Sequence, residues 1–112
     1  PPKNVFQVYG QQDNFAPGTT MASYILAAGL DLVAADASVE QPDPIGSLMA
    51  SAPPLAGNVT TNGMTVTAGA RQYAPPPGSD GHFVAFDVPS ANHDVVRFLT
   101  MAALDRQPEI GP

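Results

Sequence analysis

The order of apolar segments along the chain limits its fold more than any other sequence feature. Residues 4–9 form a short, nearly continuous apolar and aromatic run, which is typical of a strand buried on both faces. A loop and a helix-like 3–4 repeat follow it, and the same order returns between residues 64 and 105. Strands that alternate with helices predict a parallel α/β sheet.

The first of these two units carries an acidic residue in its loop. Asp13 follows the strand at 4–9, and the fixed φ of Pro17 favours the start of a helix that Gly29 ends. The apolar residues of this helix recur at the spacing of one buried face. They are Met21, Ala22, Ile25, Leu26 and Ala28.

The second unit carries a histidine in the corresponding loop. An alternating run at 64–73, in which Gly69 predicts a bulge, precedes the loop that contains His82. The last helix is expected from Pro89 onwards with Ser90 as its N-cap, and Asp94 in its first turn. Its buried stripe is predicted to be Val95, Val96, Phe98, Leu99, Ala102 and Ala103.

Residues 36–63 are rich in proline, glycine and asparagine and join the two units. We expect an irregular connection there with one helical turn around 45–50. The short apolar segment at 30–35 before it suits either a further strand or the chain returning across the sheet. Asn58-Val59-Thr60 matches a glycosylation sequon, which is a weak pattern on its own. A length of 112 residues bounds the chain to one domain, residues 1–112.

Composition excludes several classes of function. The formal net charge is −6 with only four basic residues, so a nucleic-acid interface or an anionic-membrane patch is not expected. The chain has no cysteine for a thiol nucleophile or zinc site, and no apolar run long enough for a transmembrane helix. Charged residues make up 12%, about half the usual share. Such a chain either buries surface against another polypeptide or is an Ala/Pro/Gly-rich exported protein.

Functional groups in open α/β sheets gather in loops beyond the carboxyl ends of the strands, where Asp13 and His82 are both expected. An acid and a histidine are two parts of a nucleophile–histidine–acid triad, but the chain has no Gly-x-Ser-x-Gly segment. Asp80 and Asp87 are alternative acids. His93 is expected to be exposed on the last helix, and its spacing from His82 does not favour a metal site.

Two segments resemble the α/β-hydrolase family of the bacterial lipase/esterase type. Tyr9-Gly10-x-x-Asp13-x-Phe15-x-Pro17 is similar to the acid loop of that family, and Asp80-Gly81-His82-Phe83 is similar to its histidine loop. The resemblance covers roughly residues 3–105 and implies the last two strands and flanking helices of a hydrolase sheet. It implies Asp13 and His82 as catalytic residues, in the family's order of nucleophile, acid and histidine.

The resemblance implies a serine hydrolase that cleaves small-molecule or lipid esters without a cofactor or metal. The nucleophile elbow, the oxyanion loop and the first five or six strands of the family are missing, so a separate, larger N-terminal chain is expected to supply the serine. The start at Pro1 without methionine predicts a processed chain, and we expect a secreted, periplasmic or cell-envelope location in a bacterium. An acyl pocket is expected from Phe83 with Leu48, Met49 and Leu55.

The competing hypothesis is a small non-catalytic binding or structural module of an exported protein.

Overall fold

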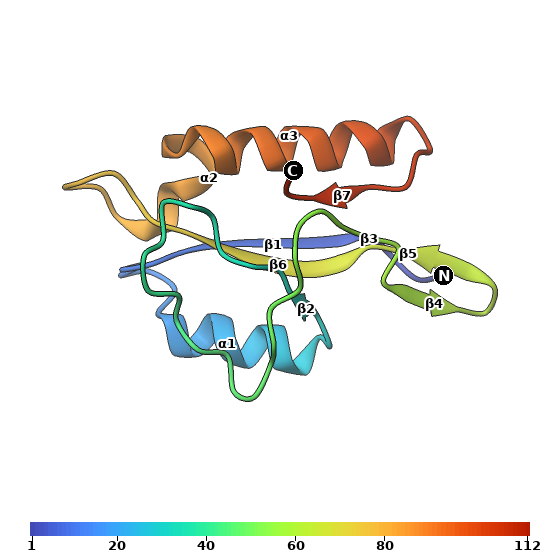
Figure 1. Ribbon diagram of the computed structural model, residues 1–112, viewed down its shortest axis with the longest axis horizontal. Helices are drawn as coiled ribbons and strands as arrows, with labels where there is room; N and C mark the ends of the chain where they lie inside the picture. Colours follow the sequence, from blue (N-terminus) through green and yellow to red (C-terminus); the bar gives the residue numbers. More distant parts are fainter.

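A three-stranded parallel sheet lies at the centre of the computed structural model, which describes residues 1–112 (Figure 1). The strand order is β1 (Val5–Gly10), β6 (Ala68–Tyr73) and β2 (Asp31–Leu32), so β6 is the middle strand. The register between β1 and β6 runs without interruption from Val5 opposite Ala68 to Gly10 opposite Tyr73. The predicted mixed α/β class is confirmed, and the sheet stays open because β1 forms one edge.

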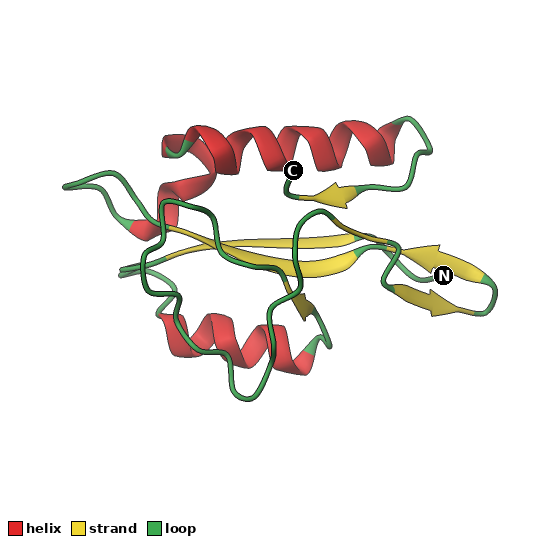
Figure 2. Ribbon diagram, viewed as in Figure 1, coloured by secondary structure: helices red, strands yellow, loops and turns green.

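Helices cover both faces of this sheet (Figures 1 and 2). Helix α1 (Gly18–Ala27) packs on one face, and α3 (Pro89–Ala103) lies across the other with the short α2 (Val84–Asp87) beside it. A single 3₁₀ turn, η1 (Gly81–Phe83), leads from the loop after β6 into α2. None of these helices has the length and apolarity that crossing a bilayer requires.

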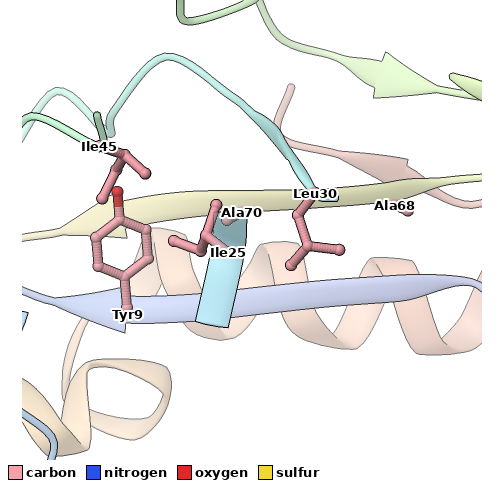
Figure 3. Packing of buried hydrophobic residues seen from close by; sticks show 6 residues of the cluster. All are labelled: Tyr9, Ile25, Leu30, Ile45, Ala68 and Ala70. Atoms are coloured by element: carbon pink, nitrogen blue, oxygen red, sulfur yellow. The ribbon is translucent and has the colours of Figure 1, made fainter. Parts of the chain in front are cut away.

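The core is divided between the two faces of the sheet. Figure 3 shows the cluster on the α1 side, where Ile25 packs against strand residues. Ile45 of the long connection belongs to the same buried cluster. On the other side Tyr73 packs with residues of α2 and α3, and Val33 packs with Phe98 and Ile110. All six residues of β6 are buried, as expected for a middle strand covered on both faces.

The connection at 36–63 differs from the prediction in two ways. It contains no helical turn at 45–50. It does contain strands: β3 (Leu55–Ala56) pairs with the C-terminal β7 (Glu109–Ile110), and β4 (Val59–Thr61) forms a hairpin with β5 (Met64–Val66). Asn62 and Gly63 turn this hairpin with positive φ angles, which these two residue types tolerate well.

That hairpin also corrects the expected single strand at 64–73. The chain leaves the hairpin at Thr67, whose hydroxyl donates to the carbonyl of Pro108, and only then enters β6. Gly69 makes no bulge, because it keeps its register with both neighbouring strands. A Cβ at Gly69 would lie 2.6 Å from Leu55, so this glycine provides room for a side chain that covers the sheet.

The last helix begins where expected but is capped and rotated differently. Val88, not the predicted Ser90, is the N-cap residue of α3, and no side chain caps this helix. The residues that α3 buries are Ala91, Asp94 and Phe98, whereas Leu99 of the predicted stripe is 61% exposed. Helix α1 likewise fully buries only Ile25 of its predicted stripe.

Candidate active site

The acid loop and the histidine loop meet at the carboxyl end of the sheet, at the left in Figure 1. The amide of Gln11 continues the pairing of β1 by donating to the carbonyl of Tyr73 at 3.0 Å. The chain then leaves β6, and the amide of Gly81 returns to donate to the carbonyl of Gln12 at 3.3 Å. Parallel pairing thus places residues near 12 and 81 against each other, as the sequence predicts.

Glycine is required at position 81 because the contact leaves no room for a side chain, and not because of a special backbone angle. A Cβ on Gly81 would lie 1.9 Å from the carbonyl oxygen of Gln11, a distance that no real side chain permits. Its φ is not in the left-handed region that favours glycine. Glycine at this position therefore allows the backbones of the two loops to approach each other closely.

Asp13 and His82 are in direct contact. Nδ1 of His82 lies 3.2 Å from Oδ2 of Asp13, across 69 positions of sequence. The Asp13 side chain is 8% exposed and the His82 side chain 44%. The other carboxylate oxygen, Oδ1, accepts the amides of Phe15 at 2.8 Å and Ala16 at 2.7 Å. Asp13 therefore shapes its own loop with one oxygen and holds the imidazole with the other.

Asp13 does not cap the helix that follows its loop. Helix α1 begins at Gly18 without any side-chain cap, and both amides that Asp13 accepts lie before it. When Nδ1–H of His82 donates to Asp13, Nε2 carries no proton, and its lone pair can accept one. Nε2 has no hydrogen-bond partner in the chain.

Two aromatic rings lie beside the imidazole of His82. The ring centroid of Phe15 lies 4.9 Å from the imidazole centroid, and that of Phe83 lies 5.2 Å from it. A cavity of about 130 Å³ lies beside the pair and is lined by both loops and by β1. The predicted lining by Leu48, Met49 and Leu55 is wrong: Met49 is 88% exposed, and the other two pack elsewhere in the core.

The competing residues do not reach the imidazole ring. Asp80 accepts the backbone amide of His82 and makes no bond to its ring, and Asp87 is exposed on α2. His93 is exposed as expected, with its Nδ1 3.5 Å from Asp94. No group of three metal-binding side chains occurs in the structure.

Sequence reasoning missed a buried polar network behind the site. Arg71 of β6 forms an ion pair with Asp94 of α3 at 2.8 Å, and the hydroxyl of Tyr73 donates to the same carboxylate oxygen at 2.5 Å. Burial, followed by the Asp94 carboxylate, raises the pKa of Tyr73 well above its ordinary value. The sequence did contain a signal for this ion pair: an arginine lies inside an apolar strand, and an aspartate lies on the helix that follows.

Comparison of the chain with protein-family models, with curated proteins and with solved structures found no match.

Proposed function

We propose that this chain is the acid- and histidine-bearing part of a serine hydrolase that cleaves esters, of the α/β-hydrolase type. The observation that carries the proposal is the 3.2 Å contact between Asp13 and His82 at the carboxyl ends of two adjacent parallel strands. An almost buried carboxylate holding a half-exposed imidazole is the geometry of the acid and base in a triad.

The proposed chemistry gives each of these two residues one task. A serine hydroxyl attacks the ester carbonyl while Nε2 of His82 takes its proton, and the imidazolium then protonates the departing alcohol. Water hydrolyses the acyl-enzyme by the same route. Asp13 keeps the proton on Nδ1, so that Nε2 faces the serine, and stabilises the imidazolium that forms. No metal or cofactor has a step in this scheme.

The free edge of β1 supports a second polypeptide as the source of the serine. β1 is hydrogen-bonded to β6 alone, which leaves an unpaired parallel edge directly beside the cavity at His82. The same edge carries an apolar groove of about 290 Å³, and Leu99 on its rim is 61% exposed. A larger N-terminal chain whose sheet continues past β1 would cover both features and bring its nucleophile to the cavity.

The exposed aromatic rings favour an apolar substrate. Phe15 is 68% exposed and Phe83 is 44% exposed, and both rings lie beside the imidazole ring of His82. A hydrocarbon group that packs on these rings removes apolar surface from water, which is favourable. We therefore propose a small-molecule or lipid ester as the substrate class, and an exported location stays a prediction from composition.

An active-site probe tests the proposal. The chain is purified with any bound partner from the organism that encodes it, treated with a fluorophosphonate and analysed by intact-mass spectrometry. We expect a larger co-purifying chain labelled on one serine, with labelling lost in His82→Ala and kept in His93→Ala. A folded monomer of 11.6 kDa that binds no such chain would instead favour the non-catalytic module.

A further inference from the structure

Asp80 connects the two loops that carry Asp13 and His82. Its Oδ1 accepts the backbone amide of His82 at 2.9 Å, and Asp80 is the N-cap residue of η1. Its carboxylate also faces Asn14, whose Nδ2 donates to Oδ2 at 2.6 Å and whose backbone amide lies 3.3 Å from both oxygens. The carboxylate of Asp80 thus binds both the amide of His82 and Asn14, which lies 66 positions before Asp80 in the sequence.

All the contacts of Asp80 favour its charged form. The amide of His82 is the largest cause that lowers the pKa of this carboxyl, and the side chain and amide of Asn14 lower it further. Asp80 is only partly buried, so water also reaches its carboxylate. Asp80 therefore stays a charged acceptor at neutral pH and binds donors on both loops at once.

The positions that Asp80 joins are those that set the catalytic geometry. Asn14 follows Asp13 directly, and the amide that Asp80 accepts belongs to His82 itself. A displacement of about 1 Å at a reacting group can lower a rate by about 10²-fold. We propose that Asp80 and Asn14 form a clamp that positions Asp13 against His82 and thereby fixes the tautomer of the imidazole.

Asp80 is a positioning residue in this scheme, because it touches neither the imidazole ring nor the space where substrate would lie. The inference depends on the proposed function only for the catalytic use of the pair. The tautomer of His82 is a property of the chain itself, and it can be read without a partner or a substrate.

The test measures the ¹⁵N chemical shifts of the His82 ring at a pH where the ring is neutral. In the unaltered chain we expect the proton on Nδ1. In Asp80→Ala we expect a substantial Nε2–H population, while the circular dichroism spectrum stays unchanged. Asp87→Ala is the matched control, since it removes an exposed carboxylate of α2 that makes no contact with His82, and it should keep the Nδ1–H form.

An exchange of the two clamp residues separates positioning from general loop stability. Asn14→Asp alone places two carboxylates together and should disturb the tautomer, even if Asp80→Ala fails to fold. The double variant Asn14→Asp with Asp80→Asn restores one amide-to-carboxylate bond in reverse, so it should recover the Nδ1–H form. A tautomer unaffected by Asn14→Asp, or not recovered in the double variant, would overturn the clamp.

In the assembled hydrolase, Asp80→Ala should lower kcat by about 10- to 100-fold with little change in KM. If the tautomer shifts as expected but no ester is cleaved by any form, the clamp stands and the proposed function fails. If ester cleavage depends on His82 but neither the tautomer nor kcat responds to Asp80, the function stands and the clamp fails.

Discussion

A Cβ atom on Gly10 would lie 2.1 Å from the carbonyl oxygen of Gly81, so the end of β1 and the start of η1 touch through bare backbone. The loop with Asp13 follows Gly10 directly, and His82 follows Gly81. The separation of the acid and the base is therefore set by a contact that only glycine permits on either side.

Replacing Gly81 by alanine should force the two loops apart. The added methyl group meets the carbonyl of Gln11, which is backbone and cannot rotate away. We expect Gly81→Ala to lower the free energy of unfolding by about 1–3 kcal/mol in urea titrations and to break the Asp13–His82 contact. Gly18→Ala is the control, since its methyl group would meet only Asp43 at 3.9 Å. Equal stability of the two variants would contradict the close contact.

Asp13→Asn should preserve the loop and damage the chemistry. The amide oxygen can still accept the amides of Phe15 and Ala16, whereas the amide nitrogen now faces Nδ1 of His82 as a donor. The imidazole then favours its other tautomer, with the proton on Nε2. By analogy with the same change in a known triad, kcat for ester cleavage should fall by about 10⁴-fold. An unchanged kcat in Asp13→Asn, with Asp87→Asn measured beside it, would show that Asp13 is not the acid.

The buried pair of Arg71 and Asp94 predicts a large effect on the stability of the fold. Asp94→Ala leaves the guanidinium without its partner and removes the acceptor of the Tyr73 hydroxyl. We expect a loss of about 3–5 kcal/mol in the free energy of unfolding. His93→Ala, at the neighbouring exposed position, should change it by less than about 0.5 kcal/mol. Similar midpoints for the two variants in a denaturant titration would disprove the role of this pair.

Alkaline pH should destabilise the fold through Tyr9. Burial, with a smaller contribution from Asp43, raises the pKa of Tyr9 from 10.0 to about 12. Below pH 10 the phenol is neutral in both states, so its contribution to stability is complete. Between pH 10 and about 12 the unfolded chain loses this proton while the folded chain keeps it, so stability falls as pH rises. Unfolding titrations should show a shallower fall in Tyr9→Phe than in Tyr24→Phe; equal slopes would contradict the prediction.

Local patterns were sufficient to predict the parts of the fold that position the site. The strand at 4–9, the helix after Pro17 and the parallel arrangement all follow from apolar spacing and turn residues, and the structure places them accordingly. The proximity of Asp13 and His82 follows in turn, because parallel neighbours end at the same edge of the sheet.

Long-range partners explain what the sequence did not predict. Leu55 pairs with a strand at the C-terminus, and Thr67 bonds to Pro108, so the break between β5 and β6 depends on residues about 40 positions away. The face that α3 buries depends on Arg71, which draws Asp94 into the core against the usual exposure of a carboxylate. Spacing within one segment carries no information about such partners.

Asn58 illustrates the same limit for a motif. Its side chain accepts the amide of Ala68 at 2.9 Å and donates to the carbonyl of Ala68 at 2.8 Å and to Asp31 at 2.9 Å. The side-chain amide of Asn58 therefore links β2 to β6 through hydrogen bonds within the fold. The sequon pattern alone did not reveal this structural role.

Ester cleavage by the assembled complex tests the catalytic role of His82 most directly. Steady-state kinetics on a short-chain ester are measured for the unaltered complex, for His82→Ala and for His93→Ala, with assembly checked by gel filtration. We predict that His82→Ala assembles normally and loses about 10⁴-fold or more in kcat, while His93→Ala keeps its kcat. Full activity of the His82→Ala complex would contradict the assignment of His82 as the general base.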